Sequence, residues 1–270
     1  MHMIRTEAFR SLAAVLVMVV MALTAGCKEQ HAGKDALIVG MELAYPPFEM
    51  TDEKGTPKGV SVDLANELGK ALGKKIVIQN TAFDGLIPSL KTGKIDLILS
   101  SMTITEERKK SIDFSDPYLT TGLCLLIGKN SPVNAIEDLD KPDITVAVKK
   151  GTTGHIYAAQ NLKNAKLLVL DKEAAAVLEV VQGKAQAFIY DQMSTYQNWK
   201  RNQDTTRALL NPFQQEKWGI ALRKGDEQLL GQVNRFLKAF REQGGFERLG
   251  DIHLKEQKQA FKELNYPFFF

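Results

Sequence analysis

Short apolar runs alternate with amphipathic segments along most of this chain. The runs are rich in β-branched residues and predict strands. Segments with apolar residues three and four positions apart, such as Val62, Ala65 and Leu68, predict helices. The expected strands are residues 36–40, 75–79, 95–100, 144–148, 166–170, 185–190 and 219–222. The expected helices are residues 61–72, 84–92, 153–160, 172–181, 193–201, 227–243 and 255–264. This alternation favours an α/β architecture with largely parallel sheets.

One helix–glycine–strand pattern occurs twice. Residues 86–98 and 178–189 each combine an amphipathic segment, a Gly-Lys pair and an apolar run. Glycine just past a helix end is a common terminator. The repeat suggests two similar lobes rather than one continuous sheet, although any two αβ units share such a pattern.

The apolar run at residues 11–23 differs from these elements. Arg5 and Arg10 precede it, and small residues follow it as far as Cys27. It is short for a bilayer core, which takes about 20 residues. The layout is typical of a secretory signal peptide. The ending Leu23-Thr24-Ala25-Gly26-Cys27 resembles the bacterial lipobox, except that Thr24 stands where the leucine is usual.

We therefore expect residues 1–26 to be a lipoprotein signal peptide, Cys27 to be lipidated, and residues 27–35 to form a polar tether. This predicts a membrane-anchored lipoprotein of the periplasm or cell envelope. A plain signal peptide and an N-terminal anchor helix are the alternatives.

Composition changes this picture little. The chain is 44% hydrophobic and 25% charged, which is ordinary for a globular protein. Charges of both signs are mixed along it, with a formal net charge of +3, so nucleic-acid binding has no compositional support. With Cys27 lipidated, Cys124 is the remaining cysteine, which excludes a disulfide scaffold. Cys124 lies in an apolar run and is expected to be a small buried hydrophobe.

Polar and aromatic residues follow several predicted strands, where ligands bind in open α/β sheets. The candidates are Glu42, Tyr45, Phe83, Ser100, Ser101, Thr103, Arg108, Thr152, Thr153 and Asp191. An arginine can grip a carboxylate, a helix N-terminus favours an anion, and an aspartate can accept from an ammonium. Together these groups suit the two charged ends of a free amino acid, and Tyr45 and Phe83 could cover its side chain.

Each candidate also has a structural alternative. Arg108 lies in a charged run of the kind that usually forms a solvated helix face. Asp191, Thr152 and Thr153 could serve only as helix caps. Phe83 could belong to the core, and Glu42 could be exposed without a role.

A longer series of motifs resembles the periplasmic amino-acid-binding proteins of ABC importers, in the polar and basic amino acid class of solute-binding protein family 3. The matching stretches begin with Ala44-Tyr45-Pro46-Pro47-Phe48-Glu49, Gly59-Val60-Ser61-Val62-Asp63-Leu64-Ala65 and Phe83-Asp84-Gly85-Leu86-Ile87-Pro88-Ser89-Leu90. They continue with Met102-Thr103-Ile104-Thr105-Glu106-Glu107-Arg108, Asp113-Phe114-Ser115-Asp116-Pro117-Tyr118, Gly151-Thr152-Thr153 and Tyr190-Asp191.

The resemblance implies a two-lobe periplasmic-binding-protein fold of type II. Lobe one would comprise residues 36–122 and 220–270, and lobe two residues 127–216, with two hinge strands between them. We expect a monomer that delivers a free L-amino acid to the membrane permease of an ABC importer. No cofactor or metal is expected.

The resemblance also assigns roles to the candidates. Arg108 would bind the ligand carboxylate together with N–H donors at Thr153, and Asp191 would bind the α-ammonium. Tyr45 and Phe83 would stack on the side chain. Acidic residues are frequent at the position of Glu42 in arginine, lysine and histidine binders, so we expect a basic ligand, with glutamine as the alternative.

A cyclohexadienyl dehydratase shares this fold and is the alternative from a different class. That enzyme would need a glutamate three residues after the late-strand aspartate, where this chain has Ser194. The proton donor that acid catalysis requires is therefore missing at that position, and we expect a binding protein rather than an enzyme.

Overall fold

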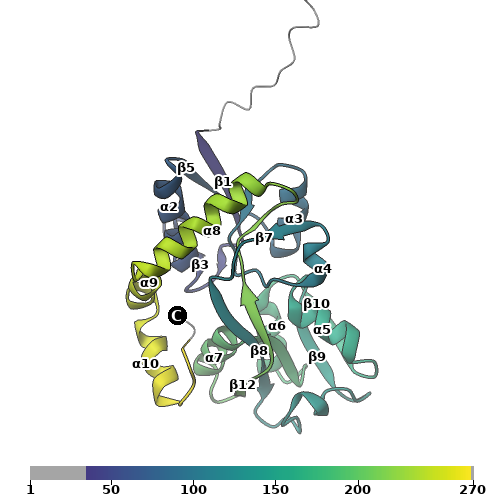
Figure 1. Ribbon diagram of the computed structural model, residues 1–270. Helices are drawn as coiled ribbons and strands as arrows, with labels where there is room; N and C mark the ends of the chain where they lie inside the picture. Colours follow the sequence, from purple (N-terminus) through teal and green to yellow (C-terminus); the bar gives the residue numbers. More distant parts are fainter. Residues whose placement is uncertain (1–34, 269–270) are drawn as a thin grey trace, which may run out of the picture. The chain divides into compact units, whose positions relative to one another are not determined.

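The computed structural model describes residues 35–268 (Figure 1). The expected signal peptide, the lipidation at Cys27 and most of the tether lie outside the described residues. Within them, two five-stranded sheets and one three-stranded sheet account for the strands. None of the described helices is both long and apolar enough to cross a membrane.

The first large sheet has the strand order β5-β1-β6-β13-β7. Its strands are β1 (Ala36–Met41), β5 (Lys75–Asn80), β6 (Leu97–Ile98), β7 (Ile112–Phe114) and β13 (Ala221–Arg223). Strand β1 pairs in parallel with β5 and β6, and β13 returns antiparallel between β6 and β7. The carboxyl ends of the parallel strands therefore meet at one edge, where the chain presents Glu42 and Ser100.

The second large sheet has the order β10-β9-β11-β8-β12. Its strands are β8 (Leu119–Gly128), β9 (Thr145–Lys149), β10 (Lys166–Leu170), β11 (Ala187–Asp191) and β12 (Thr206–Trp218). Strand β9 runs parallel to β10 and β11, whereas β8 pairs antiparallel with β11 and β12. The long strands β8 and β12 lead from this sheet toward the first, and we call them the hinge strands (Figure 1).

The helices pack on the faces of the two sheets. Around the first sheet lie α2 (Val60–Leu72), α3 (Phe83–Lys91), α4 (Glu106–Lys109), α8 (Glu227–Glu242) and α9 (Gly245–His253). Helix α10 (Lys255–Glu263) continues from α9. Around the second lie α5 (Thr153–Asn161), α6 (Glu173–Val181) and α7 (Gln192–Arg201), together with a 3-10 turn at Ile136–Asp138. Each sheet with its helices is called the first or the second lobe below. The short strands β2 (Ala44–Tyr45), β3 (Glu49–Thr51) and β4 (Pro57–Lys58) form the small sheet.

The expected helices match these elements to within one or two residues at each end, and two expectations differ in kind. Residues 95–100 form only the two-residue strand β6. The segment after residue 243 contains the additional helix α9, which begins at Gly244, where a left-handed φ of 68° breaks the line of α8. Helix α9 then runs almost directly into α10.

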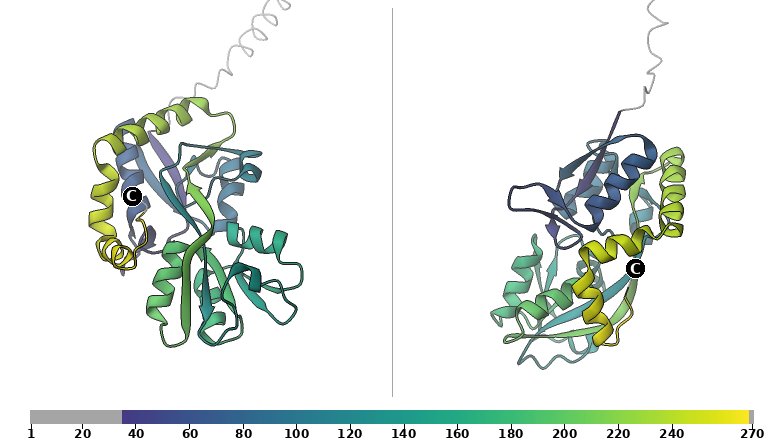
Figure 2. Two further views of the ribbon diagram at one scale, coloured as in Figure 1. Left: turned by 60° about the horizontal axis from the view of Figure 1, so that its bottom comes forward. Right: turned by 90° about the vertical axis from the view of Figure 1, so that its left-hand side faces the viewer.

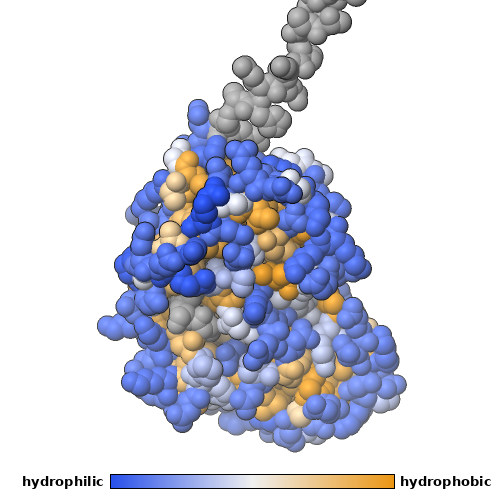
Figure 3. Space-filling model, viewed as in Figure 1, coloured by the Kyte–Doolittle hydropathy of each residue, from blue (hydrophilic) through white to orange (hydrophobic). Residues whose placement is uncertain are grey.

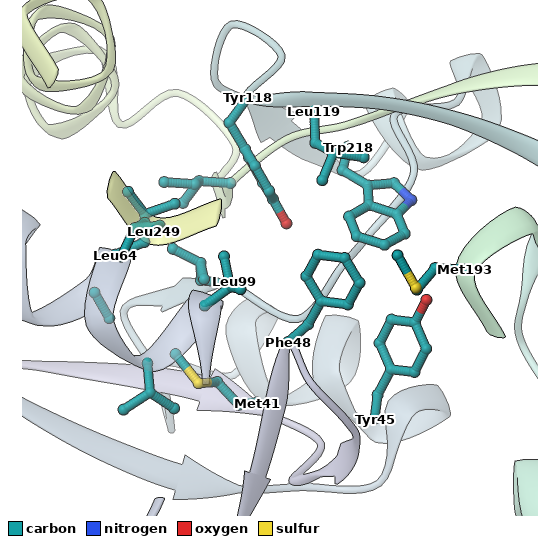
Figure 4. Close-up of a cluster of buried hydrophobic side chains, with 14 of the residues drawn as sticks. Met41, Tyr45, Phe48, Leu64, Leu99, Tyr118, Leu119, Met193, Trp218 and Leu249 are labelled. Atoms are coloured by element: carbon teal, nitrogen blue, oxygen red, sulfur yellow. The ribbon is translucent and has the colours of Figure 1, made fainter. Parts of the chain in front are cut away.

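The largest core cluster extends from the first sheet into the second lobe. Figure 4 shows part of it, with Tyr45 and Phe48 beside Trp218 and Met193. The rings of Tyr45 and Phe48 stack at 5.3 Å, and Phe48 meets the Trp218 indole edge-on at 5.1 Å. Because Met193 belongs to α7 and Trp218 ends β12, this core joins both lobes to a hinge strand.

The C-terminal helix reaches the second lobe. Phe261 of α10 is fully buried, and its ring centre lies 5.3 Å from that of Tyr196 of α7. Figure 2 shows the C-terminal part of the chain in yellow. The rings of Tyr266 and Phe268 also contact Phe261. Residues 266–268 therefore pack against α10. The face seen in Figure 3 is otherwise mostly hydrophilic, with its apolar side chains in small separate patches.

Candidate functional site

All ten candidate residues line one pocket between the lobes. They are Glu42, Tyr45, Phe83, Ser100, Ser101, Thr103, Arg108, Thr152, Thr153 and Asp191. The pocket is also lined by groups that the sequence analysis did not single out, chiefly Glu49, Tyr190, Glu216 and Trp218.

Arg108 is buried at the pocket rather than spread on a solvated helix face. Thr105 caps α4 by accepting from the Arg108 amide, and the guanidinium turns inward with only 6% of the residue exposed. One of its terminal nitrogens donates to the Thr103 carbonyl at 2.6 Å, and the other donates to the Gly151 carbonyl at 3.0 Å. Burial lowers its pKa to about 10, so Arg108 remains a cation at neutral pH. It therefore links the first lobe to the turn that opens α5.

The N-terminus of α5 faces this guanidinium. Gly151 has a φ of 77°, which lets the chain turn directly from β9 into the helix. Thr152 is the N-cap: its hydroxyl accepts from the His155 amide and donates to the Lys149 carbonyl. The capping alternative is therefore realised for Thr152, and the same turn brings free backbone donors to the pocket. An anion placed here would meet both the helix end and Arg108.

Asp191 is at once a helix cap and a wall of the pocket. Its Oδ1 accepts from the amides of Met193 and Ser194 at 3.0 and 3.1 Å, and from the Tyr45 hydroxyl at 2.6 Å. Within residues 35–268 we find no hydrogen bond to its Oδ2. Burial raises the pKa of Asp191 to about 7. A cation placed at Oδ2 would favour the ionised form.

The end of the pocket near Glu42 holds an ion pair. The Lys149 ammonium, at the end of β9 in the second lobe, bonds to the Glu42 carboxylate of the first lobe. The Lys149 side chain is 2% exposed and that of Glu42 13%. The ammonium also lies 5.4 Å from the centre of the Phe83 ring. Glu42 is therefore neither exposed nor free, and the cation that balances it comes from the protein itself.

Glu49 is a second buried carboxyl in the pocket wall, and it is 1% exposed. Its Oε2 accepts from the hydroxyls of Ser61 at 2.6 Å and Ser101 at 3.1 Å, and its Oε1 lies 3.4 Å from that of Ser100. Burial raises the pKa of Glu49 to about 8, so at neutral pH it is mostly protonated. Ser101 turns toward it with a φ of 49°, an unusual backbone conformation for serine.

A further carboxyl, that of Glu173, bonds to the Ser194 hydroxyl and to the Asn198 amide group. Ser194 holds the position that a dehydratase-like acid would need. Glu173 lies next to that position but does not line the pocket. Burial raises its pKa. Both of these partners donate to Oε1 of the carboxyl.

In the described part of the chain, neither Cys124 nor a cluster of metal-ligating side chains offers a second site. Cys124 is buried, its thiol donates to the Leu210 carbonyl at 3.4 Å, and burial raises its pKa. Among residues 35–268 no cluster of three metal-ligating side chains is present.

Comparison with known proteins agrees with the fold. The profile of the bacterial extracellular solute-binding proteins, family 3, matches residues 37–256. The L-cystine-binding protein TcyJ of Escherichia coli is 30% identical over 220 residues, which cover 81% of this chain and 82% of that protein. The L-arginine-binding protein of Pseudomonas aeruginosa is 33% identical over 222 residues, 79% of this chain and 85% of its own.

Solved structures of similar proteins have the same fold. A putative ABC-transporter binding component from Wolinella succinogenes complexed with lysine is 39% identical, with a TM-score of 0.76 over 82% of this chain and 96% of its own. The ancestral amino-acid-binding protein AncCDT-1, a precursor of cyclohexadienyl dehydratase, is also 39% identical, with a TM-score of 0.75 over 81% and 95%. The two sheets, the hinge strands and the matched family profile make this chain a member of family 3 of the bacterial extracellular solute-binding proteins, with the two-lobe α/β fold of type II periplasmic binding proteins.

Proposed function

We propose that this protein captures a free L-amino acid between its lobes and presents it to the permease of an ABC importer. The observation that carries this proposal is the pairing of opposite charges across one pocket. Arg108 comes from the first lobe and Asp191 from the second, and both line the same pocket. A zwitterion is the ligand that would use both.

The mechanism we propose is capture by closure. The ligand carboxylate would bind Arg108 and the amides at the start of α5, replacing the bond from Arg108 to the Gly151 carbonyl. The α-ammonium would bind Asp191 at Oδ2, the oxygen that Tyr45 and the α7 amides leave open. Only a ligand that touches both lobes stabilises the closed form more than the open one.

The preference for the ligand side chain depends on Lys149 as well as on Glu42. The acid at this position favours a basic ligand such as arginine, lysine or histidine. However, the Lys149 ammonium already neutralises Glu42, and it is too deeply buried to leave without opening the lobes. A cationic side chain would meet a like charge in a site with little water.

We therefore place a neutral polar side chain ahead of a basic one. The relatives bind both kinds: the matched proteins include binders of cystine and glutamine as well as of arginine and histidine. The stacking of the ligand side chain between Tyr45 and Phe83 remains part of the proposal for either kind.

The family membership supports an extracytoplasmic location. We propose in addition that the protein carries a lipid on Cys27, as the lipobox-like sequence predicts, and that it acts as a monomer. We also propose a binding role without catalysis, because the acid that a dehydratase needs is replaced by Ser194.

Calorimetry with the ligand-stripped full chain tests the proposal against the common L-amino acids, with prephenate turnover as a parallel assay. The informative variant is Asp191→Asn, because asparagine remains a good helix cap while its charge is gone. We expect Asp191→Asn to weaken amino-acid binding at least thirtyfold, about 2 kcal/mol. A loss below tenfold would make Asp191 only a cap. Binding of no amino acid, or turnover of prephenate, would contradict the proposed function itself.

A further inference from the structure

Glu216 is a buried carboxylate on a hinge strand. It lies near the end of β12, opposite Thr121 of β8, and is 5% exposed. A glutamate at such a place is costly to bury unless its carboxylate is well bonded. The sequence resemblance assigned no role to it, and Figure 1 shows β12 passing from one lobe to the other at this point.

The carboxylate of Glu216 interacts with a threonine from each lobe. The Thr103 hydroxyl, in the loop after β6 of the first lobe, donates to Oε2 at 2.9 Å. The Thr153 side chain, in the first turn of α5 of the second lobe, lines the same pocket and favours the ionised form of this carboxylate. The side-chain amide of Gln214, two residues earlier on β12, lies 3.3 Å from Oε1.

Burial raises the pKa of Glu216, and the positive charge of Arg108 opposes this shift by favouring the ionised form. Glu216 in turn favours the cationic form of Arg108. Hydrogen bonds that involve an ionised group are roughly twice as strong as neutral ones. The two threonine contacts therefore stabilise whichever arrangement lets Glu216 make both of them.

That arrangement is the closed one. Thr103 and Thr153 belong to different lobes, so one carboxylate can hold both only while the lobes are together. We propose that Glu216 is a positioning residue: from the hinge it holds Thr103 and Thr153 in place around the ligand and stabilises closure. This inference rests on the proposed function, because it assigns these two hydroxyls to the ligand pocket.

A direct role in binding the ligand ammonium fits less well. The Glu216 carboxylate already interacts with two threonines and with the guanidinium that would hold the ligand carboxylate. A positioning role predicts that Glu216 acts through the threonines. A mutation of Glu216 should therefore cost little once the threonines no longer have hydroxyl groups.

The test is a double-mutant cycle on the full chain, using the amino acid that calorimetry identifies as its ligand. Glutamine is nearly isosteric with glutamate, but it has one acceptor oxygen and no charge. We expect Glu216→Gln to weaken binding ten- to one-hundredfold, mainly through faster ligand dissociation measured by stopped flow. In a Thr103→Val, Thr153→Val background, the same substitution should cost less than threefold, because the contacts that it removes are already absent.

Two further variants make the result decisive. Glu216→Asp keeps the charge but is one methylene shorter, so its carboxylate should not reach Thr103 and Thr153 at the same time. We expect it to weaken ligand binding as well, and it replaces Glu216→Gln in the test if that variant fails to fold. Thr121→Val is the matched control on the opposite hinge strand. The Thr121 hydroxyl is buried without a partner among the described residues, and this variant should bind within twofold of the wild type.

Three outcomes would overturn the inference: fully additive costs in the cycle, binding by Glu216→Gln within threefold of the wild type, or tighter binding by that variant. The last would mean that Glu216 mainly repels the ligand carboxylate. If the unaltered protein binds no amino acid, the proposed function fails instead, which is a separate result.

Discussion

Several side chains in this pocket serve the fold and the site at the same time. Asp191 ends β11, caps α7 and holds the Tyr45 hydroxyl with a single oxygen. Thr152 caps α5 at the same edge of the second sheet. For these residues, capping and ligand binding are not exclusive, because a cap lies where a parallel strand ends and a helix begins. Ligands of α/β folds bind at that same place.

Lys149 gives the sharpest residue-scale prediction. Lys149→Met keeps the length and apolar contacts of the side chain but removes the ammonium that neutralises Glu42. We expect the affinity for arginine and lysine to rise at least tenfold relative to that for neutral amino acids, since the freed Glu42 carboxylate would attract a cationic side chain. Competition calorimetry between arginine and a neutral ligand such as glutamine measures the ratio.

Lys150→Met is the matched control. Lys150 is the next residue, about half exposed, and it pairs with Asp84 outside the ion pair described above. Its loss should leave the ratio of affinities unchanged. If Lys149→Met also leaves the ratio unchanged, the Lys149 ammonium does not set the side-chain preference.

The sequence predicts the pocket residues that directly follow strands, and it misses those paired over long distances. Arg108, Asp191 and the Gly151–Gly154 turn could be found because strand ends are visible as the ends of apolar runs. Lys149, Glu49 and Glu216 could not, because each is defined by a distant partner. Lys149 looks like an ordinary charged strand end until β9 and β1 are brought together, which places its ammonium on Glu42.

At the scale of elements, the site depends on how closely α5 packs on β11. Gly154 makes this possible, because a Cβ at this position would lie 2.6 Å from the carbonyl oxygen of Ile189. The obstacle is backbone and cannot rotate away. The N-terminus of α5, with Thr152 and Thr153, is therefore held at the pocket by the absence of a side chain one residue later.

Gly154→Ala should accordingly destabilise the protein and weaken ligand binding together. We expect a loss of about 1–3 kcal/mol in the free energy of unfolding, as for other overpacked sites, because α5 must move away from β11. Urea unfolding of the ligand-free protein gives the stability, and calorimetry gives the affinity.

Replacing Gly231 by alanine, in contrast, should not lower the free energy of unfolding. Gly231 lies inside α8, and a Cβ there would meet only the end of the flexible Arg235 side chain at 3.4 Å. Alanine is the better helix former by about 1 kcal/mol, so Gly231→Ala should be neutral or stabilising. A Gly154→Ala protein as stable as the wild type would show that α5 can shift without cost.

Helices and strands could be predicted where the spacing of apolar residues is regular. They were harder to predict where pairing between distant strands determines the length of an element. Helices α2, α6 and α8 stand out by their apolar spacing. Strand β6 has only two residues, because the chain between Ser100 and Thr103 turns to line the pocket instead of extending the sheet. The full lengths of β8 and β12 come from their mutual pairing over the hinge, which apolar runs alone do not reveal.

At the scale of the whole molecule, the pocket gathers ionisable groups away from water. The pKa values of Glu49 and Asp191 are about 8 and about 7, and the pKa of Glu173 and that of Glu216 are also raised. Burial is the main cause in each case. The four carboxyls come from different elements of the two lobes: Glu49 from β3, Glu173 from α6, Asp191 from β11 and Glu216 from β12. Their shifted pKa values are therefore a property of the assembled fold.

The free energy of unfolding should fall as the pH rises from about 5 to about 8. In the unfolded chain these carboxyls lose their protons near their ordinary values, 4.5 for Glu49 and 3.8 for Asp191. The folded protein keeps the protons up to about pH 8 and 7, so it binds more protons across this window. Stability then decreases with pH, by about 1.4 kcal/mol per pH unit for each proton retained. Above pH 8 both states are ionised and this contribution to the slope ends.

Urea unfolding of ligand-stripped protein at pH 5, 6, 7 and 8 measures this slope, and the ligand must be absent because binding adds its own stabilisation. Glu49→Gln should flatten the curve, since glutamine remains neutral in both states. Exposed aspartates with lowered pKa values, such as Asp52 and Asp84, titrate below the window and do not mask the effect. A free energy of unfolding that is constant or rises between pH 5 and 8 would mean that closure does not keep these carboxyls protonated. The lobes of the ligand-free protein would then stand open to water at the pocket.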